Sequence, residues 1–393
     1  MTWSLVKGFA FGILASAAGW EGLVADDFAS RRNAAQLSAT RMLTGHGRQT
    51  QAAWLRELAD WIEQAHGGID PLPDRRGAGA EVTDLEDEVA ELTGKPAAVL
   101  MPSGIMAQQA ALRAWTERSG HATVGMHDKS HFLVYELDAL SELHGLRPVV
   151  VTEPPRPTLA SDLARIPEPL GVLTVELPLR DCGHVLPSWD QLTELAAAVA
   201  ERGVPFHLDG ARIWESAPFL GHSCAQIAAL GDSIYVSLYK GLGGPAGAVL
   251  AGPEDFIADA RRWRHRHGGN LPSLFPIAAA GRLGLHRYLP RMAAYVEYAR
   301  ELAAAIEASG VGLVYPSPPH TNTFRIFLAA PAAGLNLAVV THAEATRVWS
   351  FPRDFRDTEV PGWAMAELIV GEATLGWKAG EVVDLLARLR ELS

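Results

Sequence analysis

The stretch HLDGARIW (207–214) follows a short apolar run, so Asp209 stands where a buried strand should end. Side chains of a strand alternate between its faces, and His207 and Asp209 therefore project on the same side. Two interpretations are open. Asp209 caps the next turn, or it is held at the C-terminal edge of a sheet, where α/β enzymes place their ligands. This window alone does not separate them.

Lys240 is a second candidate, because its turn, KGLGGPAG (240–247), directly follows the apolar run IYVSL. A surface lysine in a hairpin turn is the ordinary interpretation. However, the chain has only five lysines against 29 arginines, and this turn carries four glycines, which let a backbone approach a ligand closely. A lysine beside a desolvated pocket has a lowered pKa and becomes a nucleophile toward carbonyls. We favour this nucleophilic role for Lys240.

The stretch PSGIMAQQ (102–109) has the pattern of a strand, a turn and a helix start. Backbone N–H groups at a helix start bind phosphate, so Ser103, Gly104 and Ile105 form a candidate anion site. Such turns are common, and the motif alone is weak evidence.

Two histidines four residues apart, His127 and His131, occur in HDKSHFLVYE (127–136). On a helix they could bind a metal, with His207 as the only third candidate. Alternatively, one imidazole ring packs flat on a planar cofactor. We favour the second interpretation and expect no metal.

Together these pieces match the needs of one cofactor, pyridoxal 5'-phosphate. A lysine amine reacts with its aldehyde, an acid keeps its ring nitrogen protonated, a helix start holds its phosphate, and a flat side chain covers its ring. The protonated ring then acts as an electron sink.

The elements that must position these residues alternate between strands and helices. Apolar runs such as AAVLM (97–101) and VLTVE (172–176) are separated by helical stretches, including 188–202 with its capping-box pair Ser188 and Gln191. This alternation predicts an α/β fold, a mostly parallel central sheet with helices on both faces. Further helices are expected at 50–66 and from a capping box at Thr83–Glu86.

The C-terminal part reads differently. Almost continuous helix is expected from 253 to 308, then strands at 321–328 and 366–371, and a final helix at 379–392. This pattern predicts a smaller C-terminal α+β domain. We expect an N-terminal arm at 1–48, a large cofactor-binding domain at 49–285 and a small domain at 286–393.

Bulk properties exclude several classes of protein. The net charge of −11 gives no support for binding to nucleic acid or anionic membranes. Two cysteines do not make a disulfide framework and suit a reducing compartment. Residues 7–19 have some features of a signal peptide, but glycines interrupt the apolar stretch, and we interpret it as an N-terminal arm. We therefore expect a cytoplasmic protein that contacts neither membrane nor nucleic acid.

HLDGARIW, the KGLGGPAG turn and PSGIMAQQ resemble the threonine aldolase and aromatic amino acid β-eliminating lyase family of fold-type I pyridoxal-phosphate enzymes. The resemblance covers residues 80–270 well and the rest loosely. An acid followed by a lysine 31 residues later is its most specific element.

The resemblance implies roles for the candidate residues. Lys240 would hold the cofactor covalently, and Asp209 would pair with the pyridine nitrogen. His131 would stack on the ring and serve in catalysis, while Arg212 would reach the cofactor or the substrate carboxylate. The phosphate would be held at Ser103, Gly104 and Ile105. The family also implies a homodimer or homotetramer.

Departures from the family pattern concentrate on the substrate side. Ile105 and Tyr239 replace a threonine and a serine, and Gly268–Ser273 lacks an arginine. Glu367 stands near where the family has an arginine for the substrate carboxylate. An acid there would repel a carboxylate, so we expect weak binding of simple amino acids such as threonine.

The function predicted is cleavage of a β-hydroxy-α-amino acid substrate to glycine and an aldehyde. The alternatives are β-elimination, another reaction on an unusual amine, or a catalytically idle protein that binds pyridoxal phosphate.

Overall fold

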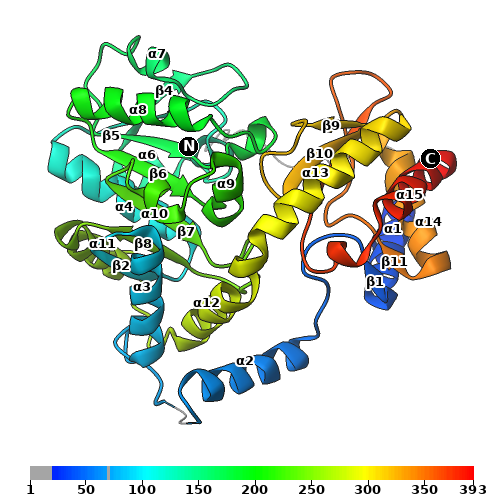
Figure 1. Ribbon diagram of the computed structural model, residues 1–393, viewed down its shortest axis with the longest axis horizontal. Helices are drawn as coiled ribbons and strands as arrows, with labels where there is room; N and C mark the ends of the chain where they lie inside the picture. The colour runs from blue at the N-terminus through cyan, green and yellow to red at the C-terminus, as the bar shows by residue number, and fades with distance from the viewer. Residues whose placement is uncertain (1–19, 69–70) are drawn as a thin grey trace, which may run out of the picture.

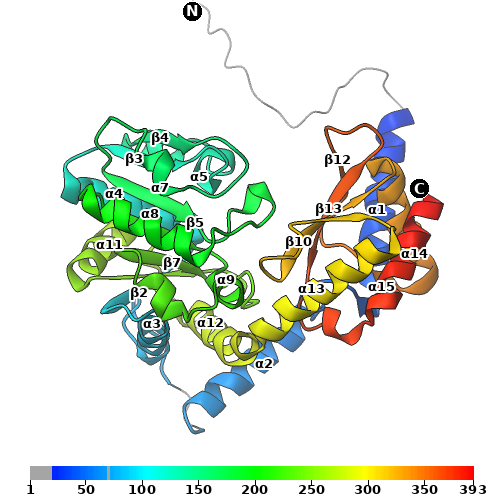
Figure 2. The ribbon, with the colours of Figure 1, turned by 45° about the horizontal axis from the view of Figure 1, so that its top comes forward.

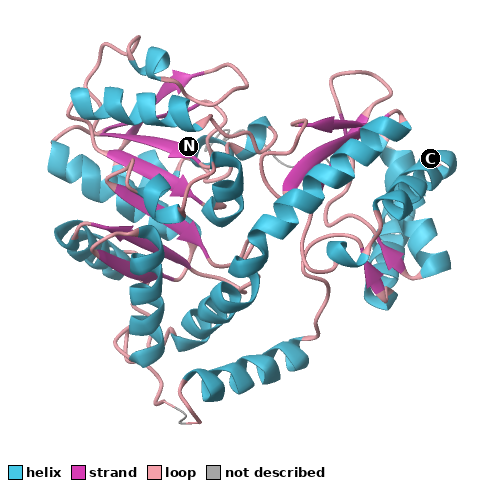
Figure 3. Ribbon diagram, viewed as in Figure 1, coloured by secondary structure: helices cyan, strands magenta, loops and turns pink. Residues whose placement is uncertain are grey.

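A computed structural model describes residues 20–68 and 71–393, whose strands form a large sheet, a smaller sheet and a two-stranded one (Figures 1 and 3). The large sheet has seven strands in the order β2-β8-β7-β6-β5-β3-β4. All its neighbouring pairs are parallel except those that β8 makes on both sides. Its strands are β2 (Ala97–Met101), β3 (Thr123–His127), β4 (Arg147–Thr152), β5 (Val172–Glu176), β6 (Phe206–Gly210), β7 (Ser233–Ser237) and β8 (Ala248–Gly252).

Helices cover both faces of this sheet. Alternate residues of one strand enter different cores: Val99 and Met101 pack in the cluster that contains α4, whereas Ala98 and Leu100 pack in the one that contains α3. Burial on both faces explains why the strands read as continuous apolar runs. The helices are α2 (Gln51–Ala65), α3 (Ala80–Thr93), α4 (Gly104–Ser119), α5 (His131–Val134), α6 (Ala139–His144), α7 (Ala160–Leu163), α8 (Trp189–Glu201), α9 (Ile213–Leu220), α10 (Cys224–Ala228), α11 (Glu254–Arg266) and α12 (Phe275–Tyr288).

The smaller sheet is antiparallel, in the order β12-β13-β10-β9, and lies apart from the large sheet (Figure 2). Its strands are β9 (Leu313–Tyr315), β10 (Thr323–Leu328), β12 (Arg356–Asp357) and β13 (Ala364–Ile369). Its helices are α13 (Met292–Ser309), α14 (Ala332–Thr346) and α15 (Ala379–Leu392). The predicted fold class, with a mostly parallel sheet and a smaller C-terminal α+β region, is confirmed.

The N-terminal part of the described chain packs on this smaller region. Helix α1 (Trp20–Ser38) lies along α14, where Arg31 pairs with Glu344 at 2.8 Å. Strand β1 (Arg41–Met42) is parallel to β11 (Val348–Trp349). Segments from the two ends of the chain are therefore neighbours (Figure 1).

Two local predictions were wrong. The helix expected at 253–308 is interrupted at 267–274 and by a 3₁₀ turn at Leu289–Arg291. Helix α3 begins at Ala80, before the predicted capping box, because Glu86 is used elsewhere: it accepts a hydrogen bond from the Leu100 amide at 2.7 Å. The capping box of α8, from Ser188 to Gln191, is confirmed.

The interpretation of residues 7–19 lies outside the described residues. Within the described ranges, the helices are too short or too polar to cross a membrane. The domain limits at 48 and 285 stay predictions. The second lies close to the 3₁₀ turn between α12 and α13.

Candidate active site

Glu176 ends β5, and Asp209, the penultimate residue of the neighbouring parallel strand β6, is its direct register partner. Burial raises the pKa of Asp209, although the charges of Lys240 and His131 counteract the shift. Burial and the adjacent Asp209 raise the pKa of Glu176 to about 7. Two carboxyl groups in one low-dielectric place resist ionising together, so the pair retains a proton near neutral pH.

Lys240 follows β7, the strand next to β6 on its other side. Burial lowers the pKa of its ammonium group, while Asp209 raises it by less. A larger share of the free amine at neutral pH is what a nucleophilic lysine requires. The parallel order β5-β6-β7 thus brings Glu176, Asp209 and Lys240 to the same edge of the sheet.

His131 begins the short helix α5, and its main-chain amide donates to Glu176 Oε1 at 2.5 Å. Its ring Nδ1 lies 2.9 Å from Glu136 Oε1. Burial lowers the pKa of His131, but Glu136 and Asp209 raise it by more. The buried Glu136 also accepts from Gln109 at 2.6 Å, which fixes the carboxylate that orients the histidine.

The start of α4 has the features of a phosphate site. Ser103 is its N-cap and uses its hydroxyl to accept from the Met106 amide at 3.2 Å, so the amides of Gly104 and Ile105 remain for a ligand. A Cβ at Gly104 would lie 2.4 Å from the hydroxyl of Tyr235 and 2.9 Å from that of Tyr239. Glycine is required here because two tyrosine hydroxyls converge on the helix start.

Arg212 and Glu215 form a second charged pair near Lys240. Arg212 Nη1 lies 3.6 Å from Glu215 Oε1, beyond hydrogen-bond length, and both carboxylate oxygens of the buried Glu215 lack a hydrogen-bond partner among the described residues. A Cβ at Gly241 would lie 2.2 Å from Glu215 Oε1, so the glycine after Lys240 is needed for close packing. Burial lowers the pKa of Arg212, and Glu215 raises it.

Most of the predicted site residues share one cavity. An inner pocket and an outer one of about 480 Å³ have a common set of lining residues: Ile105, His131, Arg180, Arg212, Tyr239 and Lys240. Gly104 and Asp209 line the inner pocket. Ser103 lines neither pocket and serves to cap α4.

The histidines considered as metal ligands are separated. His127 ends β3 and its Nε2 faces the carbonyl oxygens of Pro154 and Arg156, at 3.0 and 3.1 Å. His207 is buried, with Nδ1 2.8 Å from the Ser233 hydroxyl and Nε2 2.8 Å from Gln108 Oε1. Only His131 of the three lines the cavity.

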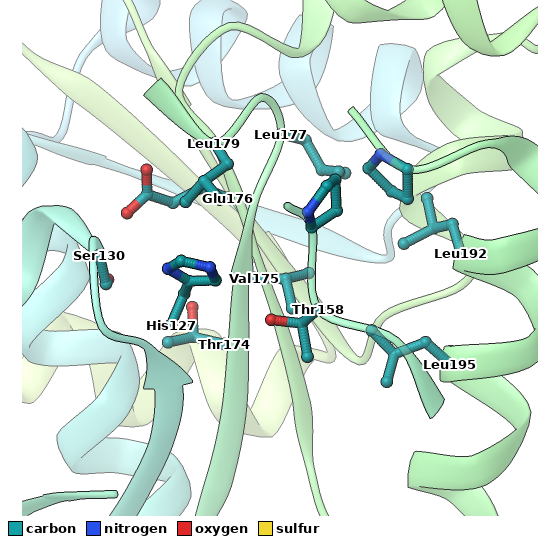
Figure 4. A pocket seen from close by; sticks show the side chains of 12 residues that line it. His127, Ser130, Thr158, Thr174, Val175, Glu176, Leu177, Leu179, Leu192 and Leu195 are labelled. Atoms are coloured by element: carbon teal, nitrogen blue, oxygen red, sulfur yellow. The ribbon is translucent and has the colours of Figure 1, made fainter. Parts of the chain in front are cut away.

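A second, small cavity of about 20 Å³ lies on the other side of Glu176, and Figure 4 shows that carboxyl group with His127 and Ser130. The Thr174 hydroxyl there has no hydrogen-bond partner among the described residues. Leucine, valine and proline side chains make up most of the remaining lining of this cavity. Glu176 therefore lines both the main cavity and this small one.

Glu367, expected to repel a carboxylate, is already paired. Its Oε2 lies 3.1 Å from Arg180 Nη2 and its Oε1 3.3 Å from His184 Nε2. Hydrogen bonding to His184 and the charge of Arg180 hold the pKa of Glu367 well below its usual range, against the effect of burial. Glu367 therefore does not present an unpaired charge to the cavity, and the sequence could not show which cation meets it. The weak binding of simple amino acids expected from this acid stays a prediction.

Sequence reasoning missed several of these groups. Glu176 ends VLTVE as Asp209 ends VPFHLD, and that repeated pattern was an available signal. Tyr235 is two residues before the end of its strand, and Glu136 is five residues after His131. Neither position has a distinctive local motif.

Comparison with known proteins identifies the family. Residues 73–331, more than half of the chain, match the family model described as Beta-eliminating lyase. The chain belongs to the beta-eliminating lyase family. The resemblance stated from the three motifs is thereby confirmed.

Individual relatives of this protein support its assignment to the beta-eliminating lyase family. The low specificity L-threonine aldolase of Escherichia coli K12 is 30% identical over 244 residues, which cover 61% of this chain and 72% of that enzyme. A provisionally assigned L-allo-threonine aldolase from Listeria monocytogenes has a TM-score of 0.83 at 31% identity, covering 93% of this chain and 99% of the other. A provisionally assigned aromatic amino acid beta-eliminating lyase/threonine aldolase from an Exiguobacterium species has a TM-score of 0.83 at 33% identity, covering 92% and 100%.

The residues of this family member fit pyridoxal phosphate. The free helix-start amides and the tyrosine hydroxyls beside Gly104 are donors for a phosphate. Lys240 supplies an amine to an aldehyde, and Asp209 supplies a carboxylate to a ring nitrogen. All these groups meet in the cavity described above.

Proposed function

We propose that this protein is a pyridoxal-phosphate-dependent lyase that cleaves a β-hydroxy-α-amino acid to glycine and an aldehyde. The observation that carries the proposal is the meeting of Lys240, Asp209 and His131 in one cavity at the carboxyl edge of the sheet. Membership of the beta-eliminating lyase family and likeness to an Escherichia coli threonine aldolase point to the same chemistry.

In this proposal the chain holds the cofactor at three points. Lys240 would bind it covalently, the amides of Gly104 and Ile105 would hold its phosphate, and Asp209 would pair with its ring nitrogen. When bound, pyridoxal phosphate supplies a protonated ring that accepts the electrons released at the substrate Cα. The Asp209 carboxylate is buried, so its charge acts with little screening by water.

His131 is the proposed base for the β-hydroxyl proton. Glu136 is within hydrogen-bond distance of Nδ1, which places the proton on that nitrogen and leaves Nε2 as the acceptor. The carboxylate then stabilises the imidazolium that forms when His131 takes the proton. This arrangement favours breakage of the bond between Cα and the hydroxyl-bearing Cβ.

The test is product analysis with the cofactor-loaded protein. L-threonine, L-allo-threonine and β-phenylserine are each supplied, and glycine and the matching aldehyde are measured, with Lys240→Ala as the inactive control. Equal amounts of glycine and aldehyde support the proposal. Ammonia and a 2-oxo acid indicate β-elimination instead, and retained cofactor without any product indicates an idle binding protein.

Assembly and location remain part of the proposal. We propose a homodimer or homotetramer in the cytoplasm with a free amino acid as its substrate, and we expect no partner nucleic acid or membrane. Sedimentation equilibrium of the loaded protein tests the assembly, and a monomer at micromolar concentration would contradict it.

A further inference from the structure

Arg180 lines both the inner and the outer pocket beside Lys240. It lies in the 3₁₀ turn Arg180–Cys182, which follows β5 at the same sheet edge as the other site residues. Its side chain is only 16% exposed. A largely buried arginine beside a substrate cavity requires an explanation, and the function proposed above assigns no role to Arg180.

The guanidinium of Arg180 is held from two sides. Nη1 donates to the Tyr135 hydroxyl at 2.8 Å, and Nη2 donates to Glu367 at 3.1 Å. The Tyr135 hydroxyl in turn donates to Asp181 at 2.8 Å. Burial lowers the pKa of Arg180, but Glu367, Tyr135 and Asp181 raise it by more, so the cation is stable. An arginine has five N–H donors in a planar fork, and the three hydrogen bonds to Tyr135 and Glu367 leave Nε and part of the fork for a ligand.

Glu367 has the properties of a positioning residue. It lies in β13, is 6% exposed, and pairs in register with Arg325 of β10. Burial lowers the pKa of His184 to about 4, so near neutral pH this ring is uncharged and Arg180 is the cation that contacts Glu367. Glu367 of the small sheet therefore fixes Arg180, which lies in the turn after β5 of the large sheet.

We propose that Arg180, fixed by Glu367, binds the α-carboxylate of the substrate together with Arg212. This inference rests on the proposed function and deepens it by naming the carboxylate site. Arg212 has uncommitted donors as well, because its nearest carboxylate is 3.6 Å away. A planar fork suits a carboxylate bidentately, which a lysine does not. In this proposal β13 carries an acid, Glu367, near where the family pattern has an arginine, but Arg180 and Arg212 still supply two cations for the carboxylate. Ordinary amino acids such as threonine therefore bind normally.

The decisive measurement is the dissociation constant of glycine, which has an α-carboxylate, against glycinamide, which does not. Isothermal titration of the loaded protein with each ligand gives both values. Arg180→Met should weaken glycine at least tenfold, because a charge-assisted hydrogen bond is lost. Glycinamide should change by less than about twofold. Equal weakening of both ligands, or unchanged glycine binding, would overturn the proposal.

Arg325→Met is a matched control. Arg325 donates to the main-chain oxygen of Asp181 at 2.9 Å, so it supports the same turn, but it lines neither pocket. Its loss should change glycine and glycinamide by the same factor. Arg180→Lys is a second variant that keeps the charge beside Glu367 if Arg180→Met does not fold. It should still weaken glycine selectively because the fork is lost, and wild-type glycine affinity in this variant would contradict the role.

Glu367→Gln tests positioning. Alone, it should raise the glycine dissociation constant and KM severalfold with little change in kcat. In the Arg180→Met background it should add nothing, because its effect passes through Arg180. An equal, additive loss in both backgrounds would show that Glu367 acts independently.

Failure of this inference is distinguishable from failure of the proposed function. The glycine and glycinamide comparison measures binding and does not depend on which bond is cleaved. If no β-hydroxy amino acid is cleaved but glycine binding still depends on Arg180, the proposed reaction is wrong and the carboxylate site stands. If cleavage occurs and Arg180→Met binds glycine normally, the proposed reaction stands and the carboxylate site is wrong.

Discussion

Glu176 and Asp209 face each other in register at the carboxyl ends of β5 and β6, two acids side by side where the cavity begins. Because both are held in a low-dielectric place, protonation of one lowers the cost of ionising the other. Near neutral pH the pair retains a proton, because burial raises the pKa of both groups, that of Glu176 to about 7. The charges of Lys240 and His131 favour the ionised form of Asp209. Asp209 can then carry the negative charge that a protonated ring nitrogen requires.

The pH dependence of stability tests this pair. The pKa of Glu176 is raised from 4.5 to about 7, so its contribution to stability is present below about pH 4.5 and is lost as the pH rises toward 7. Urea unfolding of the cofactor-free protein between pH 5 and 8 measures this loss. In the wild type the free energy of unfolding should decrease with rising pH by about 2 kcal/mol more than in Glu176→Gln. The exposed Glu153→Gln is the control and should leave the decline unchanged. A Glu176→Gln profile parallel to that of the wild type would contradict the raised pKa.

Covalent attachment at Lys240 can be observed directly. Borohydride treatment of the loaded protein should fix the cofactor on the single peptide that contains Lys240, and Lys240→Ala should retain none. Lys95 is the matched control, since burial lowers its pKa too, but its ammonium donates to the Gly231 carbonyl at 2.6 Å. Labelling in Lys95→Ala should be normal. Recovery of label on any other lysine peptide would remove Lys240 from this role.

Asp209→Asn should separate cofactor binding from turnover. The amide keeps the size of the side chain and an oxygen for the Ala211 amide, which Asp209 Oδ1 accepts at 3.0 Å, but it removes the charge. We expect kcat to fall about a thousandfold, as for the loss of a preorganised charge, and cofactor affinity to fall far less. Rapid-mixing assays and cofactor titration measure the two effects. Near-normal turnover would exclude Asp209 as the partner of the ring nitrogen.

Gly104→Ala should damage the phosphate site selectively. The added methyl group would collide with the Tyr235 hydroxyl, 2.4 Å away, at the start of α4. We expect the dissociation constant of pyridoxal phosphate to rise at least tenfold, from the loss of one charge-assisted contact, while pyridoxal without phosphate changes little. Gly380→Ala is the control, because a Cβ at Gly380 meets open space. Equal losses for both ligands would argue against a phosphate at this helix start.

Glu136→Gln should move the pH profile of the reaction. Burial lowers the pKa of His131 and Glu136 raises it by more, so removing the carboxylate lowers that pKa. If His131 must be unprotonated to accept a proton, the acidic limb of kcat shifts to lower pH, with a maximal rate reduced by about tenfold. Exposed Glu142→Gln serves as the comparison. An unmoved acidic limb in Glu136→Gln would exclude His131 as the base.

The part of the site that could be predicted from sequence is the part carried by local patterns. Asp209 and Lys240 each follow an apolar run and stand beside glycines, so a short window was sufficient for them. Glu176 also ends such a run, but its importance comes from its register with Asp209, which a single segment cannot show.

The substrate side could not be predicted because it depends on contacts between distant segments. Arg180, in the turn after β5, and Glu367, in β13, are 187 positions apart, so no spacing rule connects them. The failed capping box has a similar cause. Glu86 of α3 bonds to the Leu100 amide and to Arg261 on α11, and these tertiary contacts prevailed over a local pattern.

The pairing of β1 with β11 has a consequence for how the chain acquires its shape during synthesis. Arg41 leaves the ribosome long before its partner Val348 is made, and α1 likewise waits for α14. The seven-stranded sheet, whose last strand ends at Gly252, can form in the interval. The first described helix can thus find its place only after α14 has been made, and the nascent chain must carry it unpaired until then.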